Sequence, residues 1–223
     1  MGNWQEFSDD STKDFPVRGF VHRATVSGKD CLVLTHGAGA NCQSSLLIAL
    51  ADAFCTFGLT VLRCDLPFRQ SRPHGPPPRG SAERDQEGLR AAIASMRHET
   101  VGRIYLGGHS YGGRQASMLA ATDPGQVEGL LLLSYPLHPP QRPEEWRTGH
   151  FPGIQTPTLF VHGTRDGFGS IAEMEAARKL APARTELLPV PGAGHELITS
   201  RKRDELPKRL VQAFLSFVSD GVA

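Results

Sequence analysis

Short, nearly continuous apolar stretches recur along the chain and alternate with longer amphipathic ones. Apolar runs without regular polar alternation are typical of strands that are buried on both faces of a sheet. A weaker stretch at 17–26 is predicted to form an edge strand. The buried strands are expected within residues 30–37, 59–67, 103–110, 129–136, 156–164 and 185–192.

Segments with helical patterning separate these stretches. Strands alternating with helices predict an α/β fold, with a mostly parallel sheet of about six or seven strands and helices on both faces. No repeat or linker divides the 223 residues, so we expect a single domain over 1–223, with 1–15 poorly ordered or forming an edge of the sheet. The helices are predicted at residues 43–57, 82–96, 114–121, 171–180 and 206–218.

The formal net charge of +1 argues against nucleic acid as a partner, because phosphate binding needs a clear basic surplus. The polar start of the chain has no signal-peptide pattern, and the longest apolar run, Leu130 to Leu133, is far too short to span a bilayer. We therefore expect a cytoplasmic protein without membrane association, as a monomer or small homo-oligomer. Its cysteines lack a metal-site spacing and are predicted to be free thiols: Cys31, Cys42, Cys55 and Cys64.

One pentapeptide places a serine between a predicted strand and a predicted helix. Gly108-His109-Ser110-Tyr111-Gly112 fits the pattern G-x-S-x-G. In this pattern a sharp turn exposes the serine hydroxyl, and the flanking glycines leave room for the backbone to pack closely. The helix N-terminus that follows favours developing negative charge. We predict that Ser110 is a nucleophile.

Further motifs follow the other predicted strands, and their order along the chain matches that of a known catalytic arrangement. HGTRDG presents Asp166, and GAGHE presents His195, which gives the chain order Ser, Asp, His of a hydrolase triad. HGAGAN follows an earlier strand, and the backbone N–H groups of Ala38 and Tyr111 are the expected oxyanion-hole donors.

Other acidic residues and histidines at the strand ends are alternatives for the triad acid and base. Asp65 also ends a strand, but it precedes the serine motif and is assigned a structural role or a place at the mouth of the site. The strand after the serine motif offers no carboxylate until Glu144, so Asp166 is the preferred acid. His36 and His162 each begin an HG turn and are predicted to be structural.

With HGAGAN, GHSYGG, HGTRDG and GAGH in place, the chain resembles the α/β-hydrolase superfamily over nearly its whole length. It is most similar to the small, dienelactone-hydrolase-like serine enzymes, including the branch that contains testis-expressed proteins. Ser110 departs from the cysteine nucleophile of true dienelactone hydrolases and from the aspartate of dehalogenases and epoxide hydrolases. The resemblance implies catalysis without a metal or an organic cofactor.

The resemblance also indicates which parts of larger family members are shortened or absent in this chain. Only residues 135–157 separate two strands between which larger relatives insert a lid, so a full cap domain is not expected. The two leading strands of larger family members are expected to shrink to one or none.

We therefore expect a serine hydrolase that cleaves a small ester or thioester through an acyl-enzyme. Arg69, Arg114 and Arg165 surround the presumed mouth, where they could bind an anionic substrate or simply pair with surface carboxylates.

Two other classes remain open. An α/β-hydrolase fold that has lost catalysis could serve as a binding or scaffold protein. A dinucleotide-binding protein could use the glycines of HGAGANC with Asp65 as the ribose ligand, although Cys42 stands where the third glycine belongs.

Overall fold

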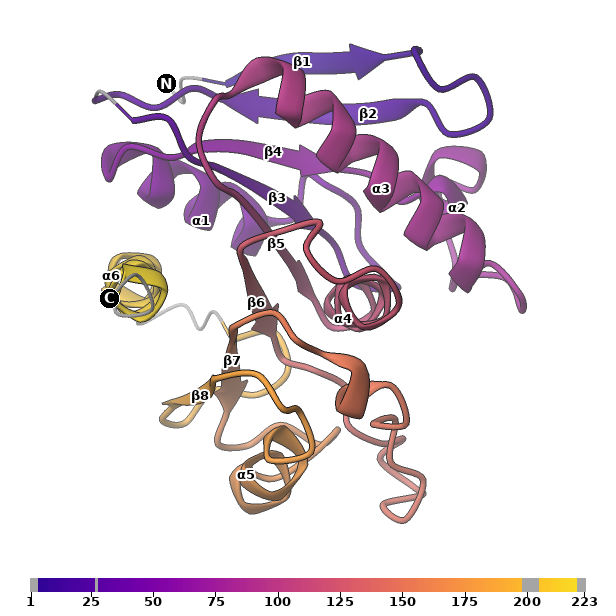
Figure 1. Ribbon diagram of the computed structural model, residues 1–223. Coiled ribbons are helices and arrows are strands. Elements are labelled where there is room, and N and C mark those ends of the chain that lie inside the picture. Colours follow the sequence, from indigo (N-terminus) through magenta and orange to yellow (C-terminus); the bar gives the residue numbers. More distant parts are fainter. Residues whose placement is uncertain (1–3, 27, 198–204, 220–223) are drawn as a thin grey trace.

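The computed structural model describes residues 4–26, 28–197 and 205–219. These residues form one eight-stranded sheet with helices on both faces, as Figure 1 shows. The spatial order of the strands is β1-β2-β4-β3-β5-β6-β7-β8. Strands β1 and β2 are antiparallel, and β2 is antiparallel to β4, whereas the remaining neighbours are parallel. The predicted α/β class is confirmed.

The strands are β1 (Trp4–Asp9), β2 (Val17–His22), β3 (Cys31–Thr35), β4 (Thr60–Cys64), β5 (Ile104–His109), β6 (Gly129–Leu133), β7 (Thr158–Gly163) and β8 (Thr185–Val190). The helices are α1 (Ser45–Thr56), α2 (Pro67–Ser71), α3 (Ala82–Glu99), α4 (Tyr111–Thr122), α5 (Ile171–Arg178) and α6 (Glu205–Ser219), with a 3-10 turn, η1 (Phe151–Gly153). Each helix predicted from the pattern is present.

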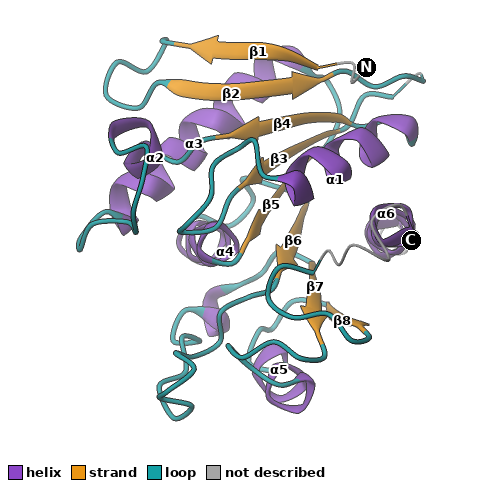
Figure 2. Cartoon of the chain, turned by 180° about the vertical axis from the view of Figure 1, so that it is seen from behind, coloured by secondary structure: helices purple, strands orange, loops and turns teal. Residues whose placement is uncertain are grey.

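The apolar runs are buried on both faces because alternate residues enter different cores. On β3, Leu32 and Leu34 pack with α1 and α6, whereas Val33 packs with α3 and α4. Figure 2 shows the same division from behind, with α1 and α6 on one side of the sheet and α3, α4 and α5 on the other. A strand covered by helices on both faces needs apolar side chains in both directions, which explains the unbroken runs.

The number of strands at the start of the chain differs from the expectation, although an edge of the sheet was one of the two possibilities expected for residues 1–15. Residues Trp4–Asp9 form an edge strand, so β2 lies one position inside the edge and the sheet exceeds the predicted count of about six or seven. The expectation that the two leading strands are reduced to one or none is therefore wrong. β1 escaped the pattern because most of its residues are exposed, and hydrogen bonds to β2 rather than burial hold it in place.

The β6–β7 connection carries only η1, which confirms that a full cap domain is absent among the described residues. Because β3, β5, β7 and the neighbouring β8 are parallel, the loops that follow them emerge along one edge of the sheet. The motifs predicted at these strand ends therefore meet. The described helices include none that is long and apolar enough to cross a membrane.

We predict that Gly113→Ala destabilises the fold. A Cβ at this position would lie 2.7 Å from the carbonyl oxygen of Gly108, so α4 would have to move away from β5. Overpacking of this kind costs roughly 1–3 kcal/mol of unfolding free energy, measurable by urea denaturation. Gly149→Ala is the matched control, since a Cβ there meets nothing within 4 Å. Equal stability of the two variants would contradict this account of the packing.

Candidate active site

The backbone at Ser110 turns sharply between β5 and α4. Ser110 has φ 52° and ψ −116°, a conformation that residues with side chains rarely adopt. The turn brings the chain against itself, since a Cβ on Gly108 would lie 2.5 Å from the carbonyl carbon of Gly112. A Cβ on Gly112 would come equally close to the carbonyl oxygen of His36, at 2.5 Å. The glycines of the motif are therefore required by close packing on both sides of the serine.

Ser110, His195 and Asp166 form a continuous hydrogen-bonded chain. The Nε2 atom of His195 lies 2.7 Å from the Ser110 hydroxyl oxygen. Its Nδ1 atom lies 3.0 and 2.8 Å from the two carboxylate oxygens of Asp166. With Nδ1 donating to the carboxylate, Nε2 is left to accept the serine proton. The structure thus brings together all three residues selected from the sequence.

Asp166 is held in its ionised form by its surroundings. Its side chain is fully buried, and burial by itself raises the pKa of the carboxyl. Hydrogen bonds from His195 and from the Phe168 N–H, at 2.9 Å, outweigh burial and bring the pKa of Asp166 below its ordinary value. A permanent carboxylate at this position fixes the imidazole tautomer.

Two aromatic side chains that the sequence did not single out orient His195. The Phe168 ring lies 4.3 Å from the imidazole, measured between ring centroids. The His109 Nε2–H donates to the backbone carbonyl of His195 at 2.9 Å, and burial lowers the pKa of His109, which keeps it neutral. Phe168 follows the acid by two residues and His109 precedes the nucleophile at the end of β5, but nothing in the sequence alone indicates that either contacts His195.

The loop after β3 is held by hydrogen bonds to one of its own carbonyls. The Gly37 carbonyl accepts hydrogen bonds from the His36 Nδ1–H at 2.8 Å and from the Ala40 N–H at 3.1 Å. Those bonds fix the Gly37–Ala38 peptide, whose N–H points the opposite way from its carbonyl. Among the described residues, neither Ala38 nor Tyr111 uses its backbone N–H in a hydrogen bond. Both donors are therefore available to a ligand.

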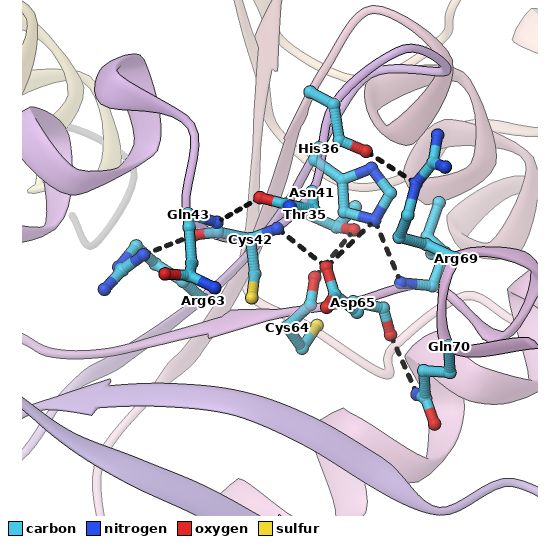
Figure 3. A network of polar contacts seen from close by, with 12 residues as sticks. Thr35, His36, Asn41, Cys42, Gln43, Arg63, Cys64, Asp65, Arg69 and Gln70 are labelled. Carbon is cyan, nitrogen blue, oxygen red and sulfur yellow. Dashed lines mark hydrogen bonds and ion pairs between the residues drawn. The ribbon is translucent and has the colours of Figure 1, made fainter. Parts of the chain in front are cut away.

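Arg69 does not occupy the position expected of a substrate ligand. Its side chain is buried and donates to backbone carbonyls: Nε to Ala40 at 2.8 Å, and one terminal nitrogen to Ala38 at 2.6 Å and to Gly75 at 2.9 Å. The other terminal nitrogen donates to the Arg72 carbonyl at 2.9 Å. Figure 3 shows the guanidinium beside the loop after β3. Arg69 thus fixes the loop that carries Ala38.

His36 and Asp65 bond to the loop after β3 and to the start of α2 and do not line the cavity above Ser110. Burial lowers the pKa of His36, so the neutral ring donates through Nδ1 and accepts from the Leu66 N–H through Nε2, at 3.2 Å. The Asp65 carboxylate accepts from the Cys42 N–H at 2.7 Å (Figure 3). Because this carboxylate, at the end of β4, is already bound to the loop after β3, the arrangement does not support the dinucleotide-binding alternative.

A cavity of about 380 Å³ opens above the serine. Residues 37–40 form one wall, and Phe168, His195 and Glu196 line the rest around Ser110. Arg114 and Arg165 do not line this cavity: Arg165 is exposed, and Arg114 lies beside a separate hollow. In the described part of the chain, no group of three or more His, Cys, Asp or Glu side chains is placed to hold a metal ion.

A family model described as an alpha/beta hydrolase domain matches residues 28–222. The chain belongs to the α/β-hydrolase family. The match extends from before β3 to beyond α6, so it includes every segment that contributes to the candidate site.

Solved structures share the family fold along the whole chain. Est1E from Butyrivibrio proteoclasticus has a TM-score of 0.77 at 15% identity, covering 96% of this chain and 99% of its own. A dienelactone hydrolase from Anabaena variabilis has a TM-score of 0.76 at 20% identity, covering 96% and 98%. A serine hydrolase without a lid from Xanthomonas campestris has a TM-score of 0.76 at 17% identity, covering 96% and 95%. The family model supports a hydrolase, and these neighbours show that the chain shares its fold with small hydrolases, among them a dienelactone hydrolase.

We predict that Arg69→Gln lowers kcat for p-nitrophenyl acetate by tenfold or more, because the loop carrying the Ala38 N–H loses its anchor; removing an oxyanion donor outright costs about 10²–10³ in rate. The assay is run well below the melting temperature and normalised to active sites titrated with a fluorophosphonate, so that partial unfolding does not count as slow turnover. Arg72→Gln, at an exposed neighbouring position, is the control. An Arg69→Gln enzyme with the kcat of the control would refute the anchoring role.

Proposed function

We propose that this protein is a serine hydrolase that cleaves a small ester or thioester through an acyl-enzyme. The observation that carries the proposal is the hydrogen-bonded chain from Ser110 through His195 to Asp166, with 2.7 Å between the serine oxygen and the imidazole. This is the arrangement in which a neutral imidazole can remove the serine proton as the oxygen attacks.

In the first half-reaction, the Ser110 oxygen attacks the carbonyl carbon of the substrate. Its proton moves to His195 Nε2, and the imidazolium that forms is stabilised by Asp166 through Nδ1–H. The tetrahedral intermediate then collapses, the bond to the alcohol or thiol breaks, and His195 returns the proton to that leaving group. The acyl group remains on Ser110.

The negative charge on the intermediate is bound by the backbone N–H groups of Ala38 and Tyr111. Each such donor contributes roughly 3 kcal/mol to transition-state stabilisation. The Tyr111 N–H also lies at the N-terminus of α4, where the helix dipole favours an anion. Because Arg69 and His36 already hold the Ala38 loop, the donors need no reorganisation when charge develops.

In the second half-reaction, a water molecule takes the place of the leaving group. His195 removes a proton from this water, and the resulting attack on the acyl carbonyl releases the carboxylic acid and restores Ser110. The same oxyanion donors serve both steps.

The site accommodates small acyl groups best. Its cavity of about 380 Å³ is open to solvent, and the short β6–β7 connection provides no cap domain to build an apolar tunnel. Long acyl chains would leave most of their apolar surface in water, so they would gain little binding energy.

We place the enzyme in the cytoplasm. All four cysteines are free and buried, and burial raises the pKa of Cys31, Cys42 and Cys55 to about 12. Free thiols suit a reducing compartment. Because every group of the proposed site comes from one chain, a monomer would suffice for activity.

The central test is Ser110→Ala. We expect kcat for an activated ester to fall about 10⁴-fold or more, because a triad without its nucleophile loses nearly all of its function. Fluorophosphonate labelling followed by peptide mapping should modify Ser110 in the unaltered protein and nothing in the variant. Ser71→Ala, at an exposed serine, is the control. An unaltered protein that is folded but neither labelled nor active would indicate an idle binding or scaffold protein instead.

We also predict that kcat/KM declines along p-nitrophenyl esters from acetate to decanoate. The physical reason is the open, capless cleft, which buries little of a long chain. The series is measured below the critical micelle concentration of each ester, so that aggregation does not distort the comparison. A preference for decanoate would show that an apolar tunnel exists and that the cleft has been misjudged.

A further inference from the structure

A second hollow, of about 600 Å³, lies beside α4 and does not belong to the serine cavity. Arg114 and Met118 of α4 form one side. The other side is formed by residues Glu145–Arg147, Gly149 and His150 of the β6–β7 connection. We call it the α4 cavity. It shares no lining residue with the cavity above Ser110.

The α4 cavity brings together two cations that lack a carboxylate partner. The Arg114 Nε atom is buried without a hydrogen-bond partner among the described residues. Arg147 makes only a long side-chain hydrogen bond, 3.4 Å, to the Pro136 carbonyl. The one carboxylate lining the cavity, Glu145, is ion-paired with Arg142 at 2.8 Å. Neither arginine forms an ion pair within the described residues, and the nearby charge of Glu145 balances that of Arg147 only in part.

The surrounding groups reinforce this imbalance. Burial, followed by the nearby charge of Arg114, lowers the pKa of Arg147, which indicates that the two guanidinium groups repel each other. The same two causes lower the pKa of His150 to about 4, so the imidazole is neutral at physiological pH and bonds to the Ser117 hydroxyl at 2.8 Å. An anion between the arginines would relieve the repulsion.

The cavity also offers flat apolar surface. The Trp146 side chain lines it and remains 38% exposed, unusually high for a tryptophan, and Met118 adds a polarisable thioether. Aromatic and guanidinium planes together favour planar groups that carry negative charge.

The cavity begins one helical turn beyond the nucleophile. Ser110 is the N-cap of α4, and Arg114 and Met118, four residues apart, share one face of the helix that follows it. The Arg114 N–H donates to the Ser110 carbonyl at 3.0 Å, and four residues of helix span about 6 Å. A substrate whose carbonyl sits at Ser110 could reach the arginines with a short chain.

We propose that the α4 cavity binds the anionic end of the substrate, a carboxylate or phosphate group, through Arg114 and Arg147. That the bound anion is part of a substrate rests on the proposed function, whereas anion binding itself does not. Both guanidinium groups supply charge-assisted, fork-shaped donors that fit such oxyanions, and Trp146 packs against the adjoining part of the ligand.

The binding test uses tryptophan fluorescence in Ser110→Ala protein, so it is independent of turnover. Trp146 reports on the cavity, and Trp4, the other tryptophan, lies on the edge strand β1. The probes are benzoate, phenyl phosphate and the uncharged benzamide. We expect saturable quenching by at least one anion, with benzamide at least tenfold weaker, and weakening by added salt. A further Trp146→Phe substitution should abolish the signal.

Arg114→Gln and Arg147→Gln, each confirmed as folded by its melting curve, should weaken anion binding by tenfold or more. Benzoate and phenyl phosphate indicate whether a carboxylate or a phosphate is preferred. Equal binding of benzamide and both anions, or unchanged anion affinity in both arginine variants, would overturn the proposal. If one variant fails to fold, the other still decides the outcome.

A second experiment links the cavity to the reaction in protein with Ser110 intact. It compares kcat/KM for the 4-nitrophenyl monoester of glutarate with that for 4-nitrophenyl 5-methylhexanoate, in which an isopropyl group replaces the carboxylate. We expect a preference of tenfold or more for the charged ester, lost in Arg147→Gln. Anion binding without this preference would refute the role in substrate recognition. Failure of ester cleavage altogether would refute the proposed function while leaving the fluorescence result to stand.

Discussion

The backbone conformation of Ser110 is the constraint on which the rest of the site depends. Its positive φ is tolerated because β5 and α4 pack so tightly around the turn that no other path is open, and Gly108 and Gly112 make that packing possible. The conformation of Ser110 is thus fixed by the packing of β5 against α4. A hydroxyl fixed in this way needs partners that are fixed as well, and His195 and Asp166 meet it from loops after β8 and β7.

Two arginines bind carbonyls of the loop opposite the serine, in addition to the bonds made by His36 and Asp65. Arg69 binds the carbonyls of Ala38 and Ala40, and Arg63 donates to the carbonyl of Cys42 farther along the same loop. Carbonyls that are drawn toward guanidinium groups hold the neighbouring N–H groups in fixed directions. This arrangement explains why a long side chain on α2, outside the cavity, can influence the site. The short helix α2, within a segment rich in proline, positions Arg69 for these contacts.

The features that could be predicted from the sequence are those determined by residues close together in the chain. Continuous apolar runs predict the central strands, which are buried on both faces, and a serine between glycines predicts the sharp turn at Ser110. The contacts of Arg69 with Ala38 and Ala40 could not be predicted, because these two acceptors lie about thirty residues earlier in the chain and depend on how two loops fold together. Arg147 was missed for the same reason, since its relation to Arg114 arises only when the β6–β7 connection packs on α4. The strand β1 was missed because its exposed side chains carry no burial pattern.

The far edge of the sheet has a consequence for how copies of the protein meet in a crowded solution. On β8, the carbonyls of Arg184 and Val190 accept from residues of β7 and its following loop, so alternation turns residues 185, 187 and 189 outward. At the outward positions, Arg178 occupies the carbonyl of Thr185 at 2.8 Å, and Pro189 has no N–H to offer. A foreign strand approaching this edge would find one acceptor already taken and one donor missing. The edge therefore resists the strand-to-strand growth that begins many aggregates.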